Sequence, residues 1–62
     1  MNIYNEITKT DTYVQLKNGE DNIVVLPANA VIFVDDESGF VAVKTVGARK
    51  TIGLVPADVY NE

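Results

Sequence analysis

The stretch from Phe33 to Val41, FVDDESGFV, places acidic residues and a serine-glycine pair between two apolar runs. β-branched and aromatic residues are typical of strands, and a short polar segment that ends in glycine is typical of a hairpin turn. We therefore predict a hairpin with its loop over residues 35–39, in which Val34 faces Phe40. Gly39 takes a positive φ in this turn, because glycine adopts that conformation without a steric penalty.

Similar apolar runs occur along the rest of the chain. Each has four to seven residues and is bounded by Gly, Pro, Asn or Asp. No window shows the 3.6-residue periodicity of an amphipathic helix, and residues 57–60 have room for one helical turn at most. The expected strands lie at residues 12–17, 23–26, 31–34, 40–46 and 51–55.

This pattern predicts an all-β fold, a small antiparallel barrel or sandwich of about five short strands joined by hairpins, SH3-like in scale. One domain spans residues 1–62. Residues 1–11 could form an N-terminal arm, and residues 57–62 form a C-terminal tail. The stretch from Ile3 to Thr8 could instead add an edge strand.

The apolar residues predict how the strands pair. Asn18-Gly19 favours a turn, and a loop over residues 18–22 brings the apolar residues of its two flanking strands together. A third hairpin turns at residues 47–50. The expected partners are Leu16 with Ile23, Val14 with Val25, Phe33 with Val41, Val31 with Val43, Thr45 with Ile52 and Val43 with Leu54.

One face of the predicted sheet then forms the core, and it carries Val31, Phe33, Val41, Val43, Ile52 and Leu54. The opposite face is also apolar. A monomer usually places polar residues on its second face. Either a curled barrel buries this face or another chain covers it. The candidate interaction surface consists of Ile32, Ala42, Lys44, Val46 and Val55.

The composition supports an association with other chains. The chain has 62 residues, 47% of them hydrophobic, with no cysteine and no histidine. A domain this small has little interior, and neither a disulfide nor a zinc site can stabilise it. We therefore expect a homo-oligomer, or a larger protein assembly that covers one face.

Charge and hydropathy argue against two other kinds of partner, nucleic acid and membrane. The net charge of −4 argues against general binding to nucleic acid or to an anionic membrane, since both require an excess of basic residues. Apolar runs fall far short of the ~20 residues that span a bilayer. The first residues, MNIYNEITK, lack the pattern of a secretory signal peptide, so we expect an intracellular location.

An acidic hairpin tip is formed by Asp35, Asp36 and Glu37. Adjacent acids lack the alternating spacing of a calcium loop, so we interpret them as a solvated turn that also hinders edge-to-edge aggregation. Neither a metal ion nor another cofactor is expected. Serine and threonine have no histidine to activate them, and we expect no enzymatic activity.

A basic hairpin tip is formed by Arg49 and Lys50. The surrounding sequence lacks the glycines and the following helix of a phosphate-binding loop. The predicted strand at 40–46 separates the acidic and basic tips by ~20 Å. Neighbouring copies could therefore meet acid to base.

The segment from Val31 to Pro56, VIFVDDESGFVAVKTVGARKTIGLVP, resembles the small acidic β-rich proteins carried by tailed bacteriophages. The resemblance lies in a short chain without cysteine or histidine in which one hairpin follows another. It implies a minor virion component, for example a capsid-decorating or cementing protein that binds a shell in many copies.

Three functions remain open from the sequence. The first is a non-enzymatic structural or interaction protein that self-associates or docks on a larger assembly. The second is a small barrel that binds nucleic acid through Lys44, Arg49 and Lys50. The third is an inhibitor whose acidic tip binds a basic partner protein.

Overall fold

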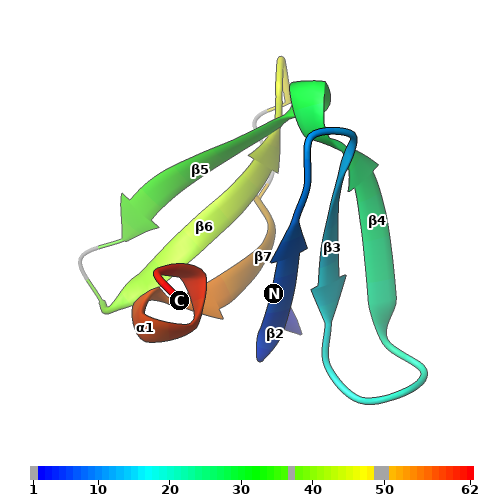
Figure 1. The fold of residues 1–62 in the computed structure, drawn as a ribbon. Helices are drawn as coiled ribbons and strands as arrows, with labels where there is room; N and C mark the ends of the chain where they lie inside the picture. The colour runs from blue at the N-terminus through cyan, green and yellow to red at the C-terminus, as the bar shows by residue number, and fades with distance from the viewer. Residues whose placement is uncertain (1, 37, 49–50) are drawn as a thin grey trace.

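The computed structural model describes residues 2–36, 38–48 and 51–62. These residues form a four-stranded sheet in the order β1-β7-β6-β5 and a three-stranded sheet in the order β2-β3-β4 (Figure 1). The all-β prediction is confirmed, in the form of two facing sheets. The elements are β1 (Asn2–Ile3), β2 (Glu6–Lys9), β3 (Tyr13–Lys17), β4 (Ile23–Pro27), the 3-10 turn η1 (Ala28–Ala30), β5 (Val31–Asp36), β6 (Phe40–Thr45), β7 (Thr51–Pro56) and α1 (Ala57–Tyr60).

The N-terminal residues belong to the fold: the alternative of an edge strand near residues 3–8 is confirmed, and the alternative of an arm over residues 1–11 is wrong for the described part of that segment. β1 pairs in parallel with β7, and β2 pairs antiparallel with β3. Between them, Tyr4 is buried, and its backbone N–H donates a hydrogen bond of 2.8 Å to the Leu54 carbonyl. The segment is therefore a crossover that contributes one strand to each sheet.

The core lies between the two sheets and receives residues from both. Its members are apolar or aromatic, as a domain without disulfides requires. The buried cluster consists of Tyr4, Val14, Leu16, Val43 and Val55. Partly buried apolar residues from β2, β4, β5, β7 and α1 surround this cluster.

The first hairpin has the predicted loop but a different register. Its loop lies between Lys17 and Ile23, as expected, and those two residues are partners. Leu16 therefore pairs with Val24 rather than with Ile23, and Val14 pairs with Leu26 rather than with Val25. Since side chains alternate along a strand, this one-residue difference turns Ile23 and Val25 outward.

The second hairpin is longer than predicted, and its side chains lie on the predicted faces of the sheet. β5 extends to Asp36, which pairs with Phe40, and Phe33 pairs with Val43. The register differs from the prediction by two residues, and a shift of two leaves every side chain on the same face. Gly39 has a φ of 94°, which confirms the conformation expected for it.

The third hairpin differs from the prediction in a way that changes the surface. A register shift between Val43 and Lys44 places Val43 opposite Gly53, where Leu54 was expected. Leu54 consequently pairs with Ala42 and faces outward, whereas Val55 pairs with Val41 and faces inward. Thr45 was also expected to pair with Ile52, but Lys44 is the residue that pairs with Thr51.

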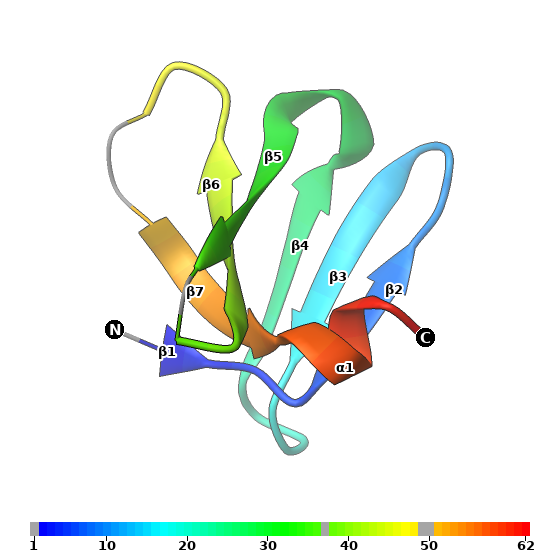
Figure 2. The same ribbon diagram turned by 90° about the vertical axis from the view of Figure 1, so that its left-hand side faces the viewer.

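A short helix closes the end of the sandwich. Residues 57–60 form one turn, α1, which lies beside the end of β7 and close to β2 (Figure 2). The Lys9 ammonium group donates a hydrogen bond of 2.8 Å to the Tyr60 carbonyl and lies 3.9 Å from the centre of the Tyr60 ring. That ring packs on Phe33, with 4.9 Å between the ring centres. These contacts join β2 and β5 through α1.

Candidate interaction surface

An apolar row crosses the outer face of the four-stranded sheet from one edge to the other. Ile3 of β1 is in register with Leu54 of β7, and Leu54 is in register with Ala42 of β6. Ala42 is in turn the partner of Val34 on β5. Partners in register lie on the same face of a sheet, so all four strands contribute to this row. We call these four residues, Ile3, Leu54, Ala42 and Val34, the apolar row.

The apolar row is open to solvent at both ends. Ile3 is 48% exposed and Val34 is 44% exposed, whereas Ala42 between the larger residues is only 9% exposed. Ile32 lies two residues before Val34 on the same face and is 43% exposed. Large aliphatic side chains that remain half exposed on one sheet face are typical of a surface that another molecule covers.

Polar and aromatic side chains border the apolar row. Lys44 is the partner of Ile32 on the outer face and is half-buried. Phe40 pairs with Asp36 at the other end of β6 and is also half-buried. An apolar centre with charged groups at its margin is the common arrangement of a protein–protein interface.

The structure brings most of the predicted surface residues together. Ile32, Ala42 and Lys44 share the outer face, in agreement with their predicted positions. Val46 follows β6, is exposed, and donates its backbone N–H to the Ala30 carbonyl at 2.8 Å. Val55 was wrongly assigned to this surface, because its side chain is 0% exposed and belongs to the core.

The predicted charged tips lie only partly within the described residues. Asp35 is exposed near the end of β5, and Asp36 is the last residue of that strand. Glu37, Arg49 and Lys50 lie outside the described residues. Along the chain, one of the two connecting segments precedes β6 and the other follows it.

Sequence reasoning missed three members of the apolar row. Ile3 was placed in a loose arm or an edge strand, Val34 was considered only as part of a hairpin, and Leu54 was assigned to the core. A signal for Leu54 existed in its neighbour Gly53. A glycine inside an apolar strand often marks a bulge or a close approach by another group, and either feature changes which residues face inward.

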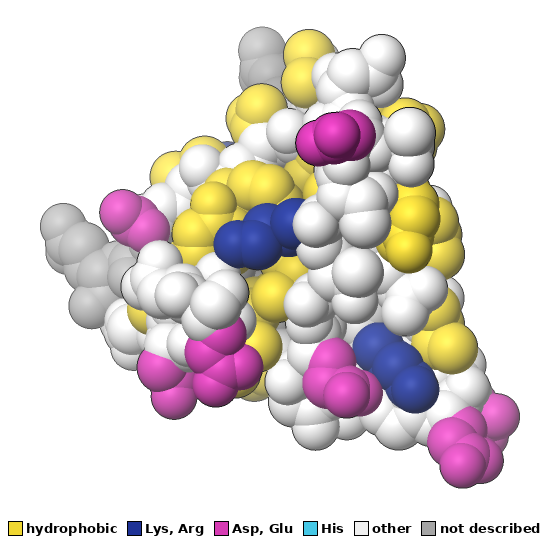
Figure 3. Space-filling view, viewed as in Figure 1, with side chains coloured by type: hydrophobic (Ala, Val, Ile, Leu, Met, Phe, Trp, Pro, Cys, Tyr) yellow, Lys and Arg dark blue, Asp and Glu magenta, His cyan; other side chains and the backbone are white. Residues whose placement is uncertain are grey.

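The remaining chemistry of the described surface is limited. No group of three or more described acidic residues is placed to hold a metal ion. A shallow groove of about 420 Å³ runs beside β2, lined mainly by residues 5–9 and by Val59 and Glu62. Figure 3 shows hydrophobic side chains around one basic side chain in the opening between β5 and β2, with acidic side chains toward the lower margin. The Lys9 ammonium group already contacts Tyr60, so the groove offers no unengaged cation among the residues described.

Within the described part of the chain, no helix has the length and apolar character needed to cross a membrane. Comparison of the chain with models of known protein families, with characterised proteins and with solved structures finds no match.

Proposed function

We propose that this protein is a non-enzymatic structural or interaction protein that docks on a larger protein assembly through the outer face of the four-stranded sheet. The observation that supports the proposal is the apolar row, which continues in register across β1, β7, β6 and β5. Burial of that row against a partner stabilises the complex, because apolar surface contributes roughly 25 cal/mol for each Å² removed from water.

The shape of the face favours a protein partner over a small molecule. A small-molecule site is a concave pocket that encloses its ligand, whereas the apolar row lies on the outside of a sheet. A nucleic-acid surface requires several basic side chains, and among the described residues Lys44 is the basic one beside the row. A flat or gently twisted apolar face fits another protein surface best.

The resemblance of residues 31–56 to small phage proteins suggests which assembly this is. We propose a virion shell, to which many copies bind as a decorating or cementing protein. A small domain suits that role, since each copy needs only one face that binds the shell. The protein would then be found within the infected cell and in the virion.

Photo-cross-linking tests this proposal even while the partner is unidentified. The photoreactive amino acid p-benzoylphenylalanine is introduced at Val34 in the cells that make the protein. Val34 is 44% exposed at the edge of the sheet, so a bulky side chain fits there without entering the core. We expect a cross-link to one major protein component of an assembly, with mass spectrometry locating the joined residues.

Thr8 provides the matched control, because it is exposed on a strand of the other sheet. We expect the same photoreactive group at Thr8 to give no such product. A cross-link between the position-34 side chains of two copies would show that this face self-associates, instead of docking on an assembly. Equal labelling at Val34 and Thr8, or a product with nucleic acid, contradicts the proposal.

A further inference from the structure

β4 is an edge strand whose unpaired backbone groups can be identified. Hydrogen bonds from the Asn18 N–H to the Asn22 carbonyl and from the Ala28 N–H to the Thr12 carbonyl lie at the two ends of the β3–β4 ladder. Hydrogen-bonded pairs alternate along an antiparallel ladder, so those between the two ends are Leu16 with Val24 and Val14 with Leu26. The N–H and C=O groups of Ile23 and Val25 therefore point away from β3.

The same two residues expose their side chains. Ile23 is 47% exposed and Val25 is 57% exposed on the outer face of the three-stranded sheet. Figure 3 shows hydrophobic side chains along the margin formed by β4. The strand sequence, IVVLP, contains no charged residue.

The other edge strands that the structure describes are protected from pairing. β1 has only two residues, and β5 ends in Asp35 and Asp36. β2 contains Glu6 and Lys9 and is accompanied by α1. Short length, charge and cover by a helix are the usual means by which proteins prevent edge-to-edge association. β4 has none of the three, and its proline lies at the last position.

We infer that β4 pairs antiparallel with β4 of a second copy, about a two-fold axis that passes beside Val24. In this register Ile23 of each copy is opposite Val25 of the other. The backbone N–H and C=O groups of these residues then form four hydrogen bonds across the axis. Pro27 lacks an N–H and lies opposite Asp21 of the other copy at the next hydrogen-bonding position, so the pairing ends there. The two three-stranded sheets become one continuous sheet of six strands.

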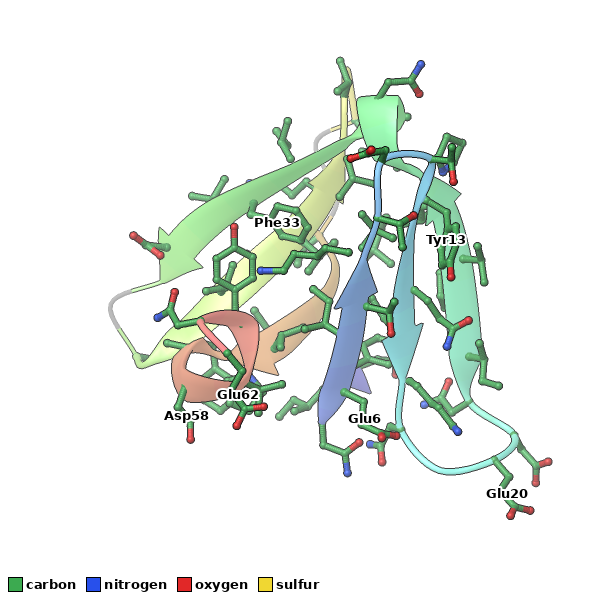
Figure 4. All side chains as sticks on the ribbon, viewed as in Figure 1. Glu6, Tyr13, Glu20, Phe33, Asp58 and Glu62 are labelled. Atoms are coloured by element: carbon green, nitrogen blue, oxygen red, sulfur yellow. The ribbon has the colours of Figure 1, made fainter. Side chains whose placement is uncertain are left out.

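The charges near β4 allow this arrangement. Glu20 lies at the tip of the β3–β4 loop, and Tyr13 lies at the opposite end of the hairpin (Figure 4). Antiparallel pairing therefore places each acidic loop, with Glu20 and Asp21, beyond the uncharged end of its partner's strand, near Pro27 and Ala28. The two acidic loops lie at opposite ends of the dimer and do not repel each other at short range.

The inference goes beyond the proposed docking function and uses a different sheet. The apolar row lies on β1, β7, β6 and β5, whereas the pairing strand belongs to the sheet β2-β3-β4. A β4 dimer leaves both copies of the apolar row free. Two linked docking faces bind a repetitive surface more tightly than one, because the second face binds at a high effective concentration.

Light scattering after gel filtration, over a wide range of protein concentrations, tests the dimer. We expect a mass of two chains for the wild type. Val25→Lys should give the mass of one chain, because it places a charge on the apolar edge opposite Ile23 of the second copy. Val25 is more than half exposed, so the variant keeps its fold, which circular dichroism verifies.

Thr8→Lys is the matched control, since it adds the same charge to an exposed site on the other edge strand of the same sheet. We expect this variant to remain a dimer. A wild-type protein that stays monomeric at every concentration overturns the inference. So does a Val25→Lys protein with the wild-type mass.

The register is tested by disulfide formation, which is simple to interpret because the chain has no cysteine. Opposite residues in a hydrogen-bonded pair lie about 5.5 Å apart between Cα atoms, within the range of a disulfide. We expect a mixture of Ile23→Cys and Val25→Cys proteins to form the mixed disulfide faster than either protein forms its own dimer. Faster formation by Val25→Cys alone, or no disulfide in the mixture, contradicts the proposed axis.

Discussion

The contact between Gly53 and Tyr4 determines how β1 joins the four-stranded sheet. A Cβ atom at position 53 would lie 2.5 Å from Cε2 of Tyr4 and 2.9 Å from the Asn2 carbonyl oxygen. Only a residue without a side chain therefore allows the Tyr4 ring to lie over β7. The ring is 1% exposed and belongs to the buried cluster, so this glycine is required by packing rather than by its backbone angles.

We expect Gly53→Ala to lower the free energy of unfolding by about 1–3 kcal/mol, the usual range for an overpacked core. The Tyr4 ring and the β1 backbone must both move to admit the methyl group. Urea denaturation followed by circular dichroism measures the loss. Hydrogen exchange should show reduced protection at the Tyr4 amide, which bonds to the Leu54 carbonyl.

Gly39→Asn is the control for this variant. Gly39 has a positive φ but open space where a Cβ would point, and asparagine tolerates the left-handed region better than most residues. We expect a smaller loss at Gly39 than at Gly53. A Gly53→Ala protein as stable as the wild type would show that Tyr4 does not occupy this place.

Which side chains face the core was predictable from the sequence in the second hairpin but not in β7. Phe33 and Val43 were assigned to the core from their pattern alone, and both pack there. The assignments of Leu54 and Val55 were exchanged, because an irregularity between Val43 and Lys44 changes the alternation. Both residues are apolar, so the sequence offers no difference in polarity that would reveal which one faces inward.

At the scale of elements, α1 is held mainly by side-chain contacts rather than by its own hydrogen bonds. A helix of one turn has almost no stability in isolation, because nucleation is unfavourable. Lys9 bonds to the Tyr60 carbonyl and covers its ring, and Phe33 supports the ring from β5. The helix therefore depends on residues contributed by both sheets.

We expect Lys9→Met to loosen α1 while the sheets remain intact. Methionine keeps the length of the side chain but removes the hydrogen bond and the cation–π contact, which is worth about 0.5–1 kcal/mol at an exposed site. Hydrogen exchange at the Asn61 amide, which bonds to the Ala57 carbonyl, should become faster.

Lys17→Met is the matched control, because Lys17 lies on β3 in register with Glu6 and Ile23. It removes the same charge without touching α1. We expect unchanged exchange at Asn61 in this variant. Equal acceleration in both variants would show that net charge, rather than the contact with Tyr60, controls the helix.

The elements themselves were largely predictable, and the pairing between them was less so. The five expected runs all became strands, and residues 57–60 became the single helical turn. The loop over 18–22 was also correct, yet the expected partner of Leu16 was wrong by one residue. All four residues at positions 23–26 are apolar, so either register buries two of them and exposes the other two.

At the scale of the whole molecule, the two sheets share a single core. The N-terminal part of the chain contributes Tyr4, Val14 and Leu16 to this core, and the four-stranded sheet contributes Val43 and Val55. Neither sheet can be removed without exposing residues of its partner. A small domain with one shared core usually unfolds in a single cooperative transition.

We expect Leu16→Ala to destabilise both sheets equally. Leu16 is 0% exposed, and such truncations typically cost about 2–5 kcal/mol, a loss that urea denaturation measures. Circular dichroism of the backbone and fluorescence of the tyrosines should report the same midpoint. Two separate transitions would contradict a shared core.

Ile32→Ala provides the comparison for this variant, because Ile32 is 43% exposed on the outer face. Exposed truncations away from special features usually change stability by less than about 0.5 kcal/mol. The difference between the two variants therefore measures the contribution of burial in the core. Similar losses in both would place Ile32 in the interior as well.

The parallel pairing of β1 with β7 has a consequence for synthesis on the ribosome. Residues 2–3 are made well before residues 53–54, which are their partners in the sheet. The β2-β3-β4 meander can form early, because each of its strands pairs with the next one along the chain. The Tyr4 side chain therefore stays uncovered until β7 has been made. Such delayed long-range pairing slows folding and prolongs the exposure of apolar surface to chaperones.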